Sequence, residues 1–175
     1  MMEEKSVKAV IQALDLNENP IGKPIEVYNY AVLVLVEEEI KVKDIYGGWH
    51  YANGLVVITG GEEIPLCRVY QESWRWFAPL FINVQDDRVI VWYPHYHKYL
   101  DNIKIYRKRK SGEKIYQPMK TREVLKEGEY VDIKMPYVYR EIDRQISIGR
   151  IIPIVDSNVL IRIEARKLEK ELYQK

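Results

Sequence analysis

The sequence predicts a mainly β fold, an antiparallel sandwich or jelly-roll-like barrel of about ten strands within a single domain of residues 1–175. Val and Ile account for 39 of the 175 residues and Tyr for 14, and these types favour the pleated surface of a sheet. Several segments alternate apolar and polar residues with period two, and turn residues separate them at short intervals. No regular series of helical patterns lies between these segments, which disfavours an α/β fold.

The N-terminal segment fits two structures equally well. Val7, Val10, Ile11 and Leu14 match one face of a helix, whereas every second residue from Val7 to Ala13 matches a strand. The sequence therefore leaves a helix and a strand open for residues 5–16.

The next segment is rich in turn residues. Asp15 to Asn19 has the carboxylate and amide side chains of an Asx turn, and the Asn, Pro and Gly residues from Asn17 to Pro24 predict a surface loop. Pro20 occupies the position at which a calcium-binding loop needs glycine, so calcium binding is not expected.

Apolar runs and alternating patterns predict the remaining strands. The longest alternation covers residues 138–148, which we expect to form one long strand. Pro153 limits the last strand to a sheet edge or a bulge. The other strands are expected at Ala31–Val36, Ile40–Tyr46, Leu55–Thr59, Pro65–Tyr70, Leu80–Val84, Arg88–Tyr93, Ile103–Arg107, Glu113–Tyr116, Tyr130–Met135 and Ile151–Val155.

Short turns between apolar runs predict hairpins. The three clearest are Gly60-Gly61, Gln85 to Asp87 and Lys110 to Gly112.

Two helices are also expected. At the C-terminus Ile161, Ala165, Leu168 and Leu172 recur at helical spacing among charged residues, which predicts a short amphipathic helix that packs on the sheet or on a partner. Thr121 to Glu127 has the capping residue and the following glycine of a single helical turn.

Composition excludes several function classes. The net charge of +1 lacks the excess of Lys and Arg that is typical of nucleic-acid binding, and the single cysteine, Cys67, excludes an internal disulfide and fits a small core thiol. The longest apolar run, Ala31–Val36, is too short to span a membrane, and the acidic N-terminus does not resemble a signal peptide, so a cytoplasmic location is expected. The scarcity of Ser, Thr and Gln beside abundant Ile, Glu, Lys and Arg is typical of thermophilic proteins, although a low-GC genome explains part of this bias.

Aromatic residues gather in three clusters near the expected strand ends. Trp, Tyr and Arg are the types enriched where proteins bind their partners, so we expect these clusters to form a binding surface, unless the Trp side chains fill the core. The candidate binding residues are Trp49, Tyr51, Trp74, Arg75, Trp76, Trp92, Tyr93, Tyr96 and Tyr99.

A metal site is an alternative. His95 and His97 lie two positions apart, so on an extended chain both imidazoles point the same way, with Asp101 close behind. This pattern resembles the first metal-binding motif of the cupins, which implies a divalent metal ion inside a β-barrel. No histidine follows His97, so His50 would have to complete the ligand set.

The segment Arg107-Lys108-Arg109-Lys110 gives a second alternative, in which a basic hairpin tip contacts nucleic-acid phosphates. No motif of a nucleophilic or phosphate-binding enzyme occurs. The sequence thus favours a non-enzymatic structural or interaction protein without a cofactor, which acts on a protein partner or on another copy of itself.

Overall fold

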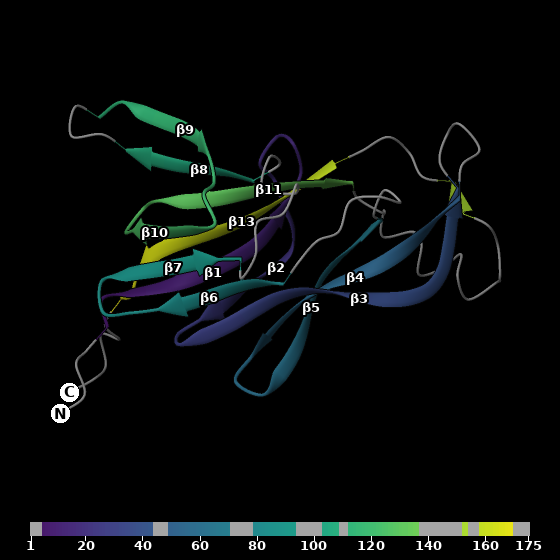
Figure 1. The fold of residues 1–175 in the computed structure, drawn as a ribbon, viewed down its shortest axis with the longest axis horizontal. Helices are drawn as coiled ribbons and strands as arrows, with labels where there is room; N and C mark the ends of the chain where they lie inside the picture. Colours follow the sequence, from purple (N-terminus) through teal and green to yellow (C-terminus); the bar gives the residue numbers. More distant parts are fainter. Residues whose placement is uncertain are drawn as a thin grey trace.

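A computed structural model of the chain describes residues 5–43, 49–70, 79–93, 103–108, 112–136, 152–153 and 158–169. Within these ranges the structure contains strands and turns and no helix. The strands form two antiparallel sheets, which we call sheet A and sheet B (Figure 1).

Sheet A has six strands, and each pairs antiparallel with its neighbours. Their order across the sheet is β2 (Pro20–Val27), β1 (Val7–Leu14), β13 (Asn158–Lys167), β11 (Tyr130–Pro136), β8 (Ile103–Lys108) and β9 (Lys114–Pro118).

Sheet B has six strands in its main order and one short addition. Its order is β10 (Arg122–Lys126), β7 (Arg88–Trp92), β6 (Leu80–Val84), β3 (Tyr30–Lys43), β4 (Trp49–Thr59) and β5 (Glu62–Tyr70). The addition, β12 (Ile152–Pro153), pairs in parallel with β3. As described, neither sheet closes into a barrel.

One apolar core lies between the two sheets. Because side chains alternate along a strand, each strand sends every second residue inward, as Val159, Ile161, Ile163 and Ala165 of β13 do. Leucines of sheet B such as Leu33 and Leu80 belong to the same cluster. Each large apolar side chain contributes about 1.5–3 kcal/mol when fully buried, so this contact is the main source of stability.

Two of the expected hairpin turns are confirmed. Gly60 and Gly61 join β4 to β5 with φ of 58° and 77°, a backbone that glycine adopts without steric cost. The β6–β7 turn closes with the Gln85 amide donating to the Arg88 carbonyl at 2.8 Å. The third turn includes residues 109–111, which lie outside the described part of the chain.

The predicted C-terminal helix is wrong. Residues from Asn158 to Lys167 form β13, which pairs with β1 on one side and β11 on the other. Residues at positions 159, 161, 163 and 165 are apolar or small and buried, a period-two pattern that overlaps the helical spacing of Ile161 and Ala165. Pairing on both sides of the strand selected the extended conformation, because tertiary contacts override local propensity.

The predicted helical turn at Thr121 to Glu127 is also wrong. Residues Arg122–Lys126 form β10 at the edge of sheet B, with Val124 opposite Ile90 of β7. Leu125 is buried, whereas its neighbour Lys126 is exposed, as strand alternation requires. Gly128, with φ of 85°, then turns the chain from β10 into β11.

The N-terminal ambiguity is resolved as a strand, and one strand lies where we expected a loop. Residues Val7–Leu14 form β1, and Pro20–Val27 forms β2 at the edge of sheet A. Proline is tolerated there because an edge strand leaves alternate amides without a partner strand. The Asx turn is confirmed, since Asp15 Oδ1 accepts hydrogen bonds from the Asn17 and Asn19 amides.

Most of the other expected strands are confirmed within a few residues. The two strands expected at Ala31–Val36 and Ile40–Tyr46 join into the single long β3, which runs with β4 beyond the other strands of sheet B (Figure 1). A register shift between Glu37 and Ile40 marks the place where we expected the break. Of the expected Ile151–Val155 strand, only Ile152–Pro153 is described, and residues 138–148 lie outside the described ranges.

Candidate functional site

The outward-facing sides of the two sheets differ in chemistry. On an antiparallel sheet, residues directly opposite each other in neighbouring strands share one face and form a cross-strand row. We define the outer face of each sheet by the rows that point away from the shared core. The rows of sheet A are mostly polar and charged, although Val10, Leu14 and Leu160 also point to this side. The central rows of sheet B are mostly apolar, with Asn83 as a polar member.

A hydrogen-bonded network occupies the outer face of sheet A. Asp132 on β11 is only 3% exposed, and its carboxylate accepts three hydrogen bonds. Arg162 on β13 donates from Nε at 2.8 Å and from Nη2 at 2.9 Å, and the Tyr116 hydroxyl of β9 donates at 2.6 Å. Arg162 Nη2 also donates to Glu18 at 2.6 Å. This network joins β9, β11, β13 and the β1–β2 turn.

Three tyrosines continue the network across the sheet. Tyr116, Tyr106 and Tyr130 stand in one row; the rings of Tyr106 and Tyr130 stack 4.5 Å apart, and the Arg162 guanidinium lies 4.0 Å from the Tyr130 ring centre. Burial and the hydrogen bond to Asp132 raise the pKa of Tyr116, and burial raises the pKa of Tyr130. The hydrogen bonds of Arg162 to the carboxylates of Asp132 and Glu18 hold the pKa of the Arg162 guanidinium above its ordinary value.

The other end of sheet A is similarly paired. Lys8 donates to Glu26 at 2.8 Å, and the Tyr28 hydroxyl donates to the same carboxylate at 2.6 Å. These bonds lower the pKa of Glu26, with Lys8 as the larger cause. The polar groups of this face therefore largely satisfy one another, which suits a face that meets water.

The outer face of sheet B has the opposite character. One row crosses all six strands of its main order, and four of the six positions are apolar, with a charged residue at each end. In order, the row is Arg122, Trp92, Phe81, Val32, Ile58 and Glu63. The rings of Trp92 and Phe81 stack 5.2 Å apart at 22°.

Neighbouring rows extend this apolar surface. We call the following set the apolar face: Tyr30, Val32, Val34, Val36, Val56, Ile58, Phe81, Ile90, Trp92 and Val124. Tyr30 is 66% exposed, Ile58 40% and Val36 38%, whereas Val56 and Ile90 are each only 6% exposed. Antiparallel sheets that meet water on one side normally place polar residues there, so a sheet that is apolar on both sides is typical of one that packs against something else.

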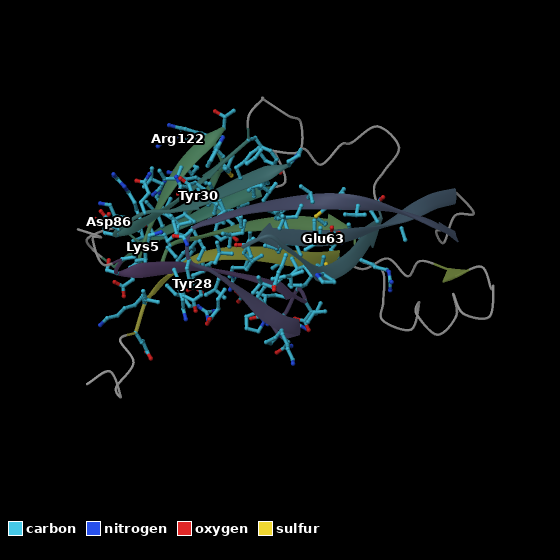
Figure 2. The ribbon with its side chains drawn as sticks, turned by 90° about the horizontal axis from the view of Figure 1, so that it is seen from below. Lys5, Tyr28, Tyr30, Glu63, Asp86 and Arg122 are labelled. Atoms are coloured by element: carbon cyan, nitrogen blue, oxygen red, sulfur yellow. The ribbon has the colours of Figure 1, made fainter. Side chains whose placement is uncertain are left out.

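The charges at the ends of this row lie on opposite edge strands. Arg122 is exposed on β10 and Glu63 is exposed on β5, and Figure 2 shows them well apart. Five intervals of about 4.8 Å separate the first and last strands of the row, or roughly 24 Å in all. The two side chains are thus too distant to pair within one chain.

Arg107 has a structural position between the sheets. From β8 of sheet A it donates to Glu123 at 2.7 Å, to Glu129 at 3.1 Å and to the Val124 carbonyl at 2.9 Å. Glu123 and Val124 belong to β10 of sheet B, so this ion pair links the two sheets at one edge.

The predicted binding residues have different positions. Trp92 is part of the apolar face, whereas Tyr93, the next residue, points into the core and is only 3% exposed, because consecutive side chains of an extended chain alternate. Trp49 and Tyr51 lie in β4, and their side chains are not described. Trp74, Arg75, Trp76, Tyr96 and Tyr99 lie outside the described residues.

The residues of the two alternatives fall mostly outside the described structure. His95, His97, Asp101, Arg109 and Lys110 are not described, and His50 and Lys108 are described only as backbone of β4 and β8. The described residues contain no group of three potential metal ligands.

Comparison with family models, with curated proteins and with solved structures finds no match to this chain. In the described ranges, no helix is long and apolar enough to cross a membrane.

Sequence reasoning missed most of the apolar face. Phe81, Val32 and Ile58 were assigned to strands but not to a site. A signal was present, because the runs Ala31–Val36 and Leu80-Phe81-Ile82 are apolar without alternation, which is typical of strands covered on both faces. The Asp132–Arg162–Tyr116 network has no such signal, since its members are brought together only by strand pairing.

Proposed function

We propose that the protein is a non-enzymatic interaction protein of β-sandwich type that binds a protein partner through the apolar face of sheet B. The observation that carries the proposal is the row of Trp92, Phe81, Val32 and Ile58, which crosses the middle of a sheet on the side away from the core. Burying such a surface contributes about 25 cal/mol for each Å² of apolar area, so association is favourable.

The contrast between the two outer faces supports this proposal. The polar groups of sheet A make hydrogen bonds and ion pairs with one another, so that face gains little from a partner. On the apolar face, the exposed side chains of Val36 and Ile58 have no polar atoms, and the ring of exposed Tyr30 carries one hydroxyl, so a partner that covers this face displaces few hydrogen bonds to water. Aromatic residues are also enriched at the centres of protein interfaces.

A thiol-protection experiment tests the proposal without knowledge of the partner. Ile58→Cys places a thiol on the apolar face, and Lys134→Cys places a matched thiol on the outer face of sheet A. The native thiol interferes little, because burial raises the pKa of Cys67 to about 12. Maleimide labelling is compared between dilute purified protein and a concentrated extract of the cells that make it.

We expect the thiol introduced at position 58 to be labelled about tenfold more slowly in the extract, as for a face about 90% occupied, while labelling at position 134 does not slow. Equal slowing at both positions, or none at position 58, would contradict the proposal. A melting temperature close to that of the wild type establishes that each variant is folded.

A further inference from the structure

We infer that the partner of the apolar face is a second copy of the same chain, packed face to face about a two-fold axis parallel to the strands. This inference rests on the proposed function, and it adds the identity of the partner and the register, that is, which residues of the two copies face each other. It comes from the sequence of residues along the row from Arg122 to Glu63.

A two-fold axis that lies in the interface and runs along the strands between β6 and β3 reverses the order of the row in the second copy. The first position of one copy then faces the sixth of the other, the second faces the fifth and the third faces the fourth. Arg122 therefore stands opposite Glu63 of the other copy, and the contact occurs twice because the interface is symmetric.

The apolar positions are complementary in the same arrangement. Trp92 faces Ile58 of the second copy and Phe81 faces its Val32, so each large ring meets a smaller branched side chain. Large residues opposite small ones interdigitate well. Two rings opposite each other would clash, and two valines opposite each other would leave a void. The reversed row is thus complementary in both charge and size.

Sheet geometry permits this packing. Two sheets stacked face to face keep their strand directions within about 30° of each other, because each sheet is twisted. A two-fold axis along the strands leaves the two sets of strands nearly parallel, which meets this condition. The apolar residues then form a layer about 10 Å thick.

In the part of the chain that the structure describes, three of the four sheet edges are poor sites for self-association. Strands β2, β9 and β5 carry Pro20 and Pro24, Pro118 and Pro65, and proline interrupts the hydrogen-bonding edge that strand addition needs. The fourth edge, β10, ends in the charged pair Arg122 and Lys126 and is short. The faces are therefore the better route, and among the described residues the face of sheet B is the more apolar of the two.

The size of the face sets the expected affinity. Six strands at about 4.8 Å and about five residues of about 3.4 Å each give roughly 500 Å² of projected area for each copy. Side-chain relief increases the accessible area, which places the dimer near the lower end of specific interfaces. We expect a dissociation constant of about 1–100 µM.

Two single charge reversals test this register. Arg122→Glu places two glutamates opposite each other in the dimer, and Glu63→Arg places two arginines opposite each other. Each variant alone should dimerise at least about fivefold more weakly, since like charges repel at both symmetric contacts. An equimolar mixture of the two variants should recover the wild-type affinity within about twofold. In the mixed dimer, a glutamate of one variant faces an arginine of the other at both contacts, so opposite charges meet again.

Sedimentation equilibrium from about 1 to 300 µM measures these affinities. Lys134→Glu on sheet A is the matched control and should dimerise like the wild type. Ile58→Lys, checked for folding by circular dichroism, should remove the dimer.

The outcomes separate this inference from the proposed function. If the purified wild-type protein stays monomeric at about 300 µM while the thiol of Ile58→Cys remains protected in the extract, self-association is overturned. The proposed function then stands, with a different protein as the partner. A wild-type dimer whose affinity is unchanged in both charge variants overturns the register proposed here. Failure of the extract to protect the thiol of Ile58→Cys, together with a purified protein that stays monomeric at about 300 µM, overturns the proposed function itself.

Discussion

The hydroxyl of Tyr116 on β9 donates a 2.6 Å hydrogen bond to Asp132 on β11, across the intervening strand β8. Neighbouring strands lie about 4.8 Å apart, so the phenol must extend along the sheet to reach a carboxylate two strands away. Asp132 thus holds the end strand of sheet A through a side chain, in addition to the backbone pairing of β9 with β8.

This bond predicts a particular response to alkaline pH. Folding raises the pKa of Tyr116 above its ordinary value of 10.0, so the stabilising effect is fully present below pH 10 and is lost as the pH rises further. We expect the free energy of unfolding to fall above pH 10, and to fall less steeply in Tyr116→Phe. Urea unfolding from about pH 8 to about pH 11.5 measures both slopes. Parallel slopes would show that Tyr116 does not cause the loss.

Removal of Asp132 should destabilise the protein strongly. Asp132→Ala leaves the partly buried Arg162 with Glu18 alone, and breaking a buried ion pair in this way costs about 3–5 kcal/mol. Glu18→Gln is the matched variant, because it removes the exposed partner of the same guanidinium and should cost less than about 1 kcal/mol. Chemical denaturation compares the two. Equal losses would contradict the assignment of Asp132 as the main partner.

The ion pairs of Arg107 with Glu123 and Glu129, which link the two sheets, also predict a loss of stability when they are broken. Arg107→Met retains the apolar stem but leaves Glu123 and Glu129 without the guanidinium, and we expect a loss of about 2 kcal/mol. Arg166→Met, which removes an exposed pair on β13, should change stability by less than about 0.5 kcal/mol. Urea denaturation measures both variants. An Arg107 variant as stable as the wild type would show that packing alone joins the two sheets here.

Apolar runs and period-two alternation together predicted the β class and most of the strands of sheet B, because burial on one face or on both leaves a direct record in the sequence. The pattern failed where two periods coincide, as at Ile161 and Ala165, whose spacing of four fits both a helix and a strand. It also failed at β2, where prolines indicated a loop but the edge of a sheet accommodates them.

The candidate surface was less predictable than the fold. Trp92 was identified by residue type, but Tyr93 was grouped with it although the two point to opposite sides of the sheet. The row from Arg122 to Glu63 depends on strand order, which one sequence does not specify, because hydrophobic patterning identifies strands without identifying their neighbours.

The left-handed backbone of Gly61 in the β4–β5 hairpin predicts a loss of stability on substitution that does not depend on side-chain contacts. Gly61 has φ of 77°, and a Cβ at this position would meet no atom within 4 Å. Gly61→Ala should still cost about 1–2 kcal/mol, since a left-handed backbone is unfavourable for other residues. Gly61→Asn should cost less, because asparagine tolerates this conformation. Thermal unfolding ranks the three proteins, and an alanine variant as stable as the asparagine variant would contradict the strain argument.

The raised pKa of Cys67 predicts that its thiol reacts slowly with disulfide reagents in the native protein. Burial raises its pKa from 9.0 to about 12, and the thiolate is the reactive form, so at about pH 8 the thiol is almost entirely protonated. In the native protein, a disulfide reagent should therefore react far more slowly than in urea, where the thiol regains an ordinary pKa. Ile58→Cys supplies an exposed thiol on the neighbouring strand as the comparison. Equal rates at Cys67 in native and unfolded protein would contradict its partial burial against the core.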